Sequence, residues 1–89
     1  MTITTRYFLT SGGVKLPLRM VNEIEPEALS NRNTFIRANY DGNGRLLRFE
    51  KLVYGDIELT HVYAYDSQGA LRRVEIALPD EEPMVLDFP

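Results

Sequence analysis

The chain has 89 residues, of which 44% are apolar, and it carries a formal net charge of −3 at pH 7. The apolar content excludes a disordered chain, and the acidic balance argues against a general nucleic-acid binder. The sequence contains no cysteine, which excludes disulfides, thiolate metal sites and a thiol nucleophile. We expect one domain over residues 1–89 in the cytoplasm, because the sequence has no secretory signal and no apolar run of about 20 residues that could span a membrane.

The first 22 residues predict a β-hairpin. Residues 5–10 are rich in β-formers, and Ser11–Gly13 is a turn signal. Apolar side chains then alternate along Val14–Met20, which is the period of a strand. The segment Ser11–Lys15 has neither the spacing nor the following helix of a phosphate-binding loop, so we interpret it as the hairpin turn.

One short helix is expected near residues 25–31. Pro26 suits the first helical turn, and Glu25 and Glu27 suit the positive end of the helix dipole. No other segment of the sequence favours a helix.

An internal repeat dominates the second half of the chain. The segment Tyr40–Glu50 returns as Tyr65–Glu75, with Tyr, Asp, Gly, Leu, Arg and Glu at the same places. In each copy the Asp can bond its own backbone and the last Gly can take a positive φ, so each copy reads as strand, tight turn, strand. The repeated hairpins occupy residues 34–78, and the fold class is mainly β: an antiparallel meander of six or seven strands.

The middle turn of this meander fixes a register. We take Gly55-Asp56 as a two-residue hairpin loop, which places Glu50 opposite His61 and Arg48 opposite Tyr63. On this register seven apolar side chains form one stripe on the sheet: Leu52, Tyr54, Ile57, Leu59, Val74, Ile76 and Leu78.

Such a stripe needs a cover, because soluble monomers rarely expose so large an apolar patch. One candidate is the acidic tail, residues 79–89, whose apolar end could add a strand or dock on the sheet. The other is a second copy of the chain, which would present the same stripe in a symmetric homodimer. We predict the homodimer.

Two resemblances follow from the repeat and its surroundings. The unit Tyr-Asp-x-x-Gly-x-Leu, which begins at Tyr40 and at Tyr65, resembles the YD repeat of large bacterial surface and toxin-delivery proteins, in which tandem hairpins build extended sheets. The second copy has Ala70 where that repeat usually carries Arg. A longer string, made of residues 13–18, 31–34 and 49–55, is similar to a family of small uncharacterised bacterial proteins, and this resemblance implies no known activity.

The candidate chemistry is sparse. His61 is the only histidine, and a carboxylate beside it would orient the ring and raise its pKa. One hypothesis is therefore a hydrolase or isomerase that uses His61 and Glu50, with Arg48 holding a small anionic substrate. The other is an ordinary cross-strand pair. The loop that begins at Asp41 lacks the later ligands of a calcium site, so we interpret it as a turn.

Five arginines interleaved with tyrosines leave open an anionic ligand or single-stranded nucleic acid, although nearby glutamates dilute that positive field: Arg37, Arg45, Arg48, Arg72 and Arg73. The interpretation we favour is a small non-catalytic binding or protein-interaction module, with no catalytic residue, no cofactor, no metal ion, and neither nucleic acid nor membrane as partner.

Overall fold

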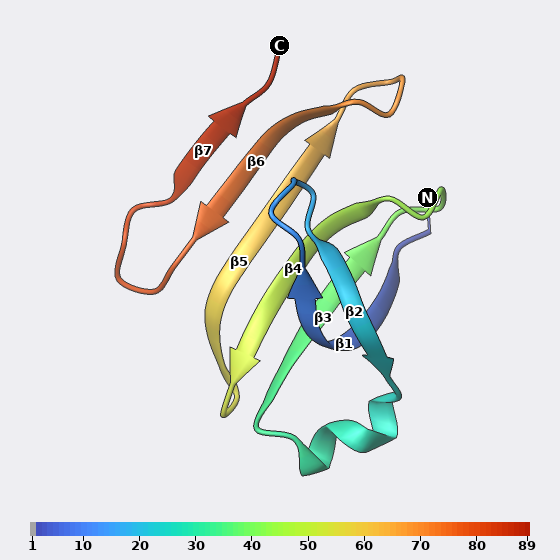
Figure 1. The fold of residues 1–89 in the computed structure, drawn as a ribbon, viewed down its shortest axis with the longest axis vertical. Coiled ribbons are helices and arrows are strands. Elements are labelled where there is room, and N and C mark those ends of the chain that lie inside the picture. Colours follow the sequence, from blue (N-terminus) through green and yellow to red (C-terminus); the bar gives the residue numbers. More distant parts are fainter. Residues whose placement is uncertain (1) are drawn as a thin grey trace.

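The computed structural model describes residues 2–89, and it is one antiparallel sheet of seven strands with a single short helix in the described part of the chain (Figure 1). The predicted mainly-β fold and the helix near residues 25–31 are confirmed. The elements are β1 Thr4–Gly12, β2 Arg19–Ile24, the 3₁₀-helix η1 Pro26–Asn31, β3 Thr34–Tyr40, β4 Leu46–Val53, β5 Asp56–Tyr65, β6 Leu71–Ala77 and β7 Met84–Asp87.

The strands lie in the order β2-β1-β3-β4-β5-β6-β7. From β3 onward each strand pairs with the next one along the chain, as a meander requires. The N-terminal hairpin enters with β1 beside β3, so β2 forms one edge of the sheet and β7 the other. The η1 segment carries the chain from β2 past β1 to β3 at one end of the sheet (Figure 1).

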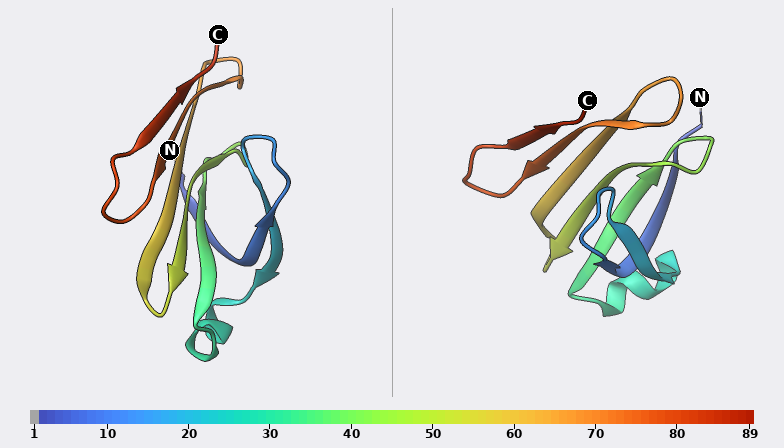
Figure 2. Two further views of the ribbon diagram at one scale, coloured as in Figure 1. Left: turned by 60° about the vertical axis from the view of Figure 1, so that its left-hand side comes forward. Right: turned by 45° about the horizontal axis from the view of Figure 1, so that its top comes forward.

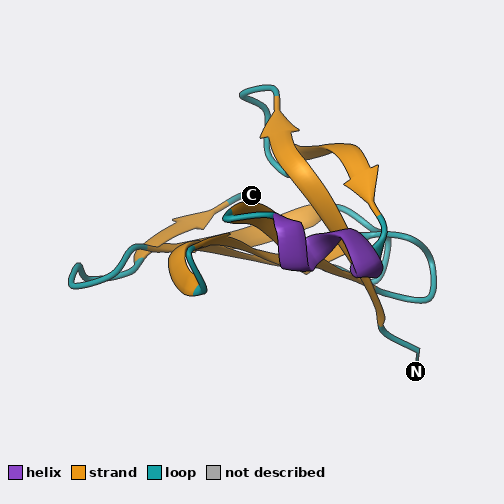
Figure 3. Cartoon of the chain, turned by 90° about the horizontal axis from the view of Figure 1, so that it is seen from below, coloured by secondary structure: helices purple, strands orange, loops and turns teal. Residues whose placement is uncertain are grey.

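The core lies on one face of the sheet, which we call the core face. Directly paired residues share a face, and the pairs Ala38–Phe49, Phe49–His61 and Tyr63–Val74 place these side chains together. The β1–β2 hairpin stands out from the plane of the sheet and curls over this face (Figures 2 and 3). The hairpin adds Leu16, Leu18 and Met20 to a buried cluster of Phe8, Ile36, Ala38, Leu46, Phe49, Tyr63 and Val74.

The two repeat turns have the same hydrogen-bonding scheme. The Asp41 carboxylate accepts the backbone N–H groups of Asn43 and Arg45 at 2.8 and 2.9 Å. Asp66 accepts those of Gln68 and Ala70 at 2.8 and 3.0 Å. The glycine that closes each turn, Gly44 or Gly69, has a φ of 80° or 84°, a conformation that residues with a Cβ resist.

Arg45 joins the first repeat to the second. Its Nε donates to the Asp41 carboxylate at 3.0 Å, while its guanidinium lies 5.6 Å from the ring centre of Tyr65. The Tyr65 hydroxyl in turn donates to the Leu46 carbonyl at 2.7 Å. The second repeat has Ala70 at the corresponding place, and its Asp66 is bonded by Arg72 instead. No third repeat follows in this chain, so an arginine at position 70 would have no further Tyr-Asp hairpin to stack on.

The predicted β4–β5 register is wrong by two residues next to the turn and by one residue farther along the strands. The hairpin turn is Tyr54-Gly55, because Val53 pairs with Asp56 and both turn residues have positive φ, 50° and 83°. Primed two-residue turns need that conformation, and the glycine takes the second place rather than the first. The strained tyrosine is held by its backbone N–H, which donates to the Asn33 carbonyl at 2.6 Å. Moving the turn by one residue shifts the pairing by two and keeps the faces. The β-bulge between the pairs Leu52–Ile57 and Lys51–Leu59 adds a shift of one residue, which exchanges the faces of the side chains beyond it.

The acidic tail becomes a strand and not a cover. Residues Met84–Asp87 pair with β6 as the outer strand β7, and the Arg73 guanidinium donates to the Asp87 carboxylate at 2.7 Å. Strand β7 therefore extends the sheet sideways and leaves both faces of this end as they are.

We predict that Arg45→Ala destabilises the fold more than Arg72→Ala does. Both changes remove an ion pair to a turn aspartate, but only Arg45 also stacks on a tyrosine ring, an interaction worth about 0.5–1 kcal/mol at a partly exposed site. Urea unfolding of the two variants measures the difference. Equal losses would show that the Arg45–Tyr65 contact contributes nothing.

Candidate functional site

His61 is buried on the core face as part of a short hydrogen-bonded chain. Its Nδ1 lies 2.8 Å from the Tyr63 hydroxyl, and its ring lies 4.5 Å from that of Phe49. The backbone N–H of Leu18, in the hairpin, donates to the same hydroxyl at 3.3 Å. Because the hydroxyl accepts from Leu18, its own proton is free to go to His61 Nδ1, which leaves the imidazole neutral with its hydrogen on Nε2.

Burial sets the protonation states of the His61 imidazole and the Tyr63 phenol. It lowers the pKa of His61 below its usual value, since desolvation disfavours the charged imidazolium. It raises the pKa of Tyr63 to about 12, so the phenol stays neutral. The chain from Leu18 through Tyr63 to His61 is therefore an uncharged link that fastens the hairpin to the sheet.

Glu50 is buried on the other side of the sheet, which we call the open face. Its carboxylate accepts hydrogen bonds from Arg37 Nε and Nη2 at 3.0 and 2.8 Å and from Arg48 Nη2 at 3.1 Å. Burial by itself raises the pKa of this carboxyl, but the bonds and charges of the two arginines outweigh it, and the pKa lies below its usual value. Glu50 is a carboxylate already satisfied by its two arginines.

The structure separates the proposed acid–base pair. Phe49 pairs with His61, and Glu50 pairs with Thr60, so the imidazole and the carboxylate lie on opposite faces of the sheet. Arg48 lies with Glu50 on the open face and away from His61. Burial lowers the pKa of His61 and no carboxylate raises it. The geometry that the hydrolase or isomerase hypothesis required is absent from the described residues.

The seven residues of the predicted stripe are dispersed. Val74 is fully buried in the core, and Leu59 and Ile76 pack against it. Leu52 is buried at the pair with Ile57 on the open face. Tyr54 lies in the exposed turn, and Leu78 follows β6. The register error explains this dispersal, and the structure does not form the stripe as one surface.

A different apolar surface lies on the core face at the β6–β7 end, where the hairpin does not reach (Figure 2). The pairs Ile76–Met84 and Val74–Leu86 place these side chains on the core face, and alternation extends the row to Leu78 and Phe88. We call Ile76, Leu78, Met84, Leu86 and Phe88 the apolar wing. Leu78, Met84 and Phe88 are 43%, 57% and 37% exposed.

Sequence reasoning had a signal for this surface and did not use it. In residues 84–88 the apolar Met84, Leu86 and Phe88 alternate with Val85 and Asp87, which is the pattern of a strand with one apolar face. The sequence predicted that this segment adds a strand or docks on the sheet, and no apolar surface of its own was expected.

The hairpin tip surrounds an open hollow of about 320 Å³, lined by Gly12, Gly13, Val14, Lys15, Leu16, Pro17 and Arg19. Its only charged groups are Lys15 and Arg19, and it holds neither a nucleophile nor an acid. Within residues 2–89, no three His, Cys, Asp or Glu side chains are placed to hold a metal ion, and no helix is long and apolar enough to cross a membrane.

These features define a small protein built from a single antiparallel β-sheet, with one face covered in part by its own hairpin. The chain belongs to a family of unknown function, DUF6156, whose family model matches residues 1–89. No curated protein and no solved structure matches the chain.

We expect Tyr63→Phe to cost about 1–3 kcal/mol of unfolding free energy, because it leaves the Leu18 N–H and His61 Nδ1 without their partner. Tyr65→Phe is the matched control: it removes a hydroxyl that serves one backbone carbonyl and should cost less. Chemical denaturation of both variants checks the difference. A Tyr63→Phe loss no larger than that of Tyr65→Phe would show that the link from Leu18 through Tyr63 to His61 does not stabilise the fold.

His61 should make stability depend on pH. Its pKa is lower in the folded chain than its usual value of 6.5, so the unfolded chain binds more protons as pH falls below about 7. The stabilisation is therefore complete above pH 6.5 and declines as the pH drops toward the lowered folded pKa. Unfolding free energies measured from pH 7.0 to 5.5 should fall for the wild type and stay nearly flat for His61→Gln, and parallel curves would exclude His61 as the cause.

Proposed function

We propose that this protein is a non-catalytic protein-interaction module that uses the apolar wing as its contact surface. The observation that carries the proposal is the exposure of Met84 on the core face of β7, together with Leu78 just after β6 and Phe88 just after β7, which alternation places on the same face. Single exposed apolar residues are ordinary, whereas contiguous ones mark interaction sites. The wing is continuous with the protein's own core, so apolar side chains of a partner can pack against it.

The absence of a catalytic role is supported by what the candidate groups already do. Asp41 and Asp66 bond the backbone of their turns, Glu50 is held by two arginines, and His61 is bonded to Tyr63. A general acid or base must be free to exchange a proton with a substrate. Each of these groups instead serves the fold, which favours binding over catalysis.

Three further proposals concern origin and setting. A cytoplasmic location is supported by the absence of cysteine. A bacterial origin and a relation to the YD repeat rest on the two Tyr-Asp hairpins, whose turns share one hydrogen-bonding scheme. The repeat relation concerns architecture and adds no activity.

The test compares two neighbouring substitutions on β7. Met84 lies on the core face and Val85 on the open face, and they are 57% and 45% exposed. Tagged wild type, Met84→Glu and Val85→Glu are each used to capture partners from extracts of the native cell. We expect wild type and Val85→Glu to retain the same protein, whether another gene product or the untagged chain, and Met84→Glu to lose at least about nine-tenths of it.

Circular dichroism on the three purified chains controls for folding. A protein held equally by wild type and Met84→Glu would contradict the wing as contact surface. An extract in which wild type holds nothing above an unrelated tagged protein would count against the module itself.

A further inference from the structure

We infer that the occupant of the apolar wing is the wing of a second copy of this chain, in a symmetric dimer. This inference rests on the proposed function, since it names the partner of the same surface. The two copies would place their core faces against each other at the β6–β7 end, beyond the reach of the hairpins.

The exposed area of the chain supports a second copy. The chain has 6086 Å² of accessible surface, whereas a compact monomer of 10.2 kDa exposes about 5,300 Å². The excess is about 800 Å², which is what one partner contributes to an interface of standard size. The radius of gyration, 13.4 Å, likewise exceeds the value of about 12 Å expected for a compact chain of this length.

The fold lacks a second layer over the outer part of the core face. A sheet buries its apolar face against another layer of structure, and the hairpin supplies that layer only over part of the sheet (Figures 2 and 3). The wing carries the same kind of side chains as the covered region but has no cover of its own. Two such wings, packed about 10 Å apart as in a β-sandwich, would cover each other by one self-complementary contact.

Contact through the face is favoured over pairing through the free edge of β7. The Phe88 N–H donates to the Arg72 carbonyl at 2.9 Å, so the even-numbered residues of this segment direct their backbone toward β6 and the odd-numbered ones toward the free edge. Of those odd positions, 83 and 89 are prolines without an N–H. Only Val85 and Asp87 could donate an N–H to an added strand, which makes this a poor edge for augmentation.

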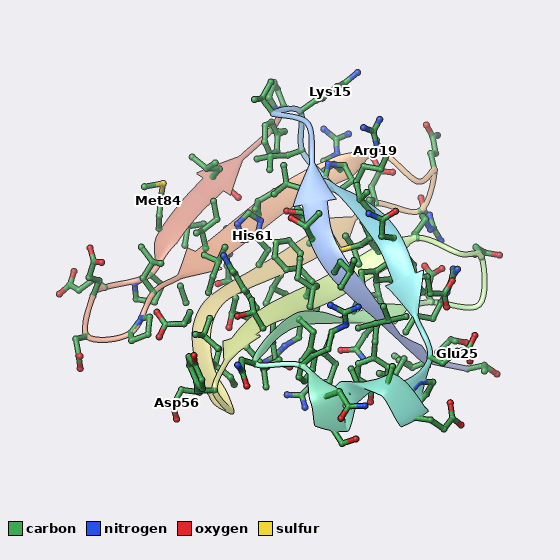
Figure 4. The ribbon with its side chains drawn as sticks, turned by 60° about the horizontal axis from the view of Figure 1, so that its bottom comes forward. Lys15, Arg19, Glu25, Asp56, His61 and Met84 are labelled. Carbon is green, nitrogen blue, oxygen red and sulfur yellow. The ribbon has the colours of Figure 1, made fainter. Side chains whose placement is uncertain are left out.

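Charged side chains of both signs are available to a partner with the same surface. The β6–β7 turn holds Asp80, Glu81 and Glu82, and the hairpin tip holds the cationic Lys15 and Arg19 (Figure 4 labels Lys15, Arg19 and Met84). None of these five side chains forms an ion pair within residues 2–89. A second copy brings both signs, and complementary charges across a contact favour a defined register.

The experiment is sedimentation equilibrium of the purified full chain over about 1–100 µM, a range in which mass action reveals micromolar dimers. The wild type should approach twice its 10.2 kDa mass. Met84→Glu should raise the dissociation constant at least about tenfold, and Phe88→Glu, which lies just beyond β7, should do the same. Val85→Glu, on the opposite face of the same strand, should dimerise like the wild type.

Three results would overturn the inference: a wild type that stays monomeric at the highest concentration, a dimer that Met84→Glu and Phe88→Glu leave intact, or a dimer that Val85→Glu disrupts equally. Circular dichroism and thermal unfolding of each variant separate lost association from lost folding. A monomeric purified chain that still captures another protein in a Met84-dependent way would reject the dimer and keep the interaction module. A chain that neither associates nor captures would reject both.

Discussion

The closure of the β1–β2 hairpin over one face of the sheet is the contact on which the rest of this structure depends. The sheet offers two faces, and its own β1–β2 hairpin, which curls out of the plane, is the element of the described chain that is large enough to cover part of one of them. The hairpin covers the part of the sheet nearest its attachment at β3. This position of the hairpin places the core over β1 and β3–β6 and buries Phe49 and Val74 completely. The outer end of the same face is left without a second layer.

The polar groups of the protein are arranged around this closure. On the covered face the Tyr63 hydroxyl receives the Leu18 N–H of the hairpin and faces His61 on the sheet, so one neutral chain of hydrogen bonds satisfies three groups at the boundary of the core. On the open face Glu50 must keep its charge near water, and two partly exposed arginines hold it there. The sheet separates these two arrangements, and that separation is why their residues act as structural groups.

The sequence predicted the repeat, the turns and the single helix well because each depends on local chemistry. An aspartate that bonds the backbone two and four residues on, followed by a glycine with positive φ, specifies its turn without help from the rest of the chain. The β4–β5 turn could not be read in this way. Tyr54 adopts a φ of 50°, which a bulky residue resists, and its N–H bonds to Asn33 from a distant segment.

The turn together with the β-bulge next to it decided the arrangement of the candidate site. The turn at Tyr54-Gly55 moves the pairing by two residues, and the bulge between the pairs Leu52–Ile57 and Lys51–Leu59 moves it back by one, so Phe49 instead of Glu50 stands opposite His61. The predicted apolar stripe is thereby divided between two faces. The apolar wing, by contrast, was visible in the alternation of residues 84–88. What the sequence did not reveal was whether that segment would lie on the sheet or beside it, because the answer depends on how far the hairpin reaches.

Contacts within the plane of the sheet are limited near β7, whereas contacts above that plane are not. Along the repeat direction, Arg45 links one hairpin to the next, and Ala70 ends that series of contacts. On either side of the outer strand, Pro83 and Pro89 lack the N–H groups that would extend pairing with another strand beyond Val85 and Asp87. Growth within the plane of the sheet is therefore opposed at this end, while the apolar side chains above that plane are left exposed. Edge prolines protect a sheet from unwanted strand addition. Because the free edge beside β7 carries such prolines while the neighbouring apolar face is exposed, association through the face is favoured over association through the edge.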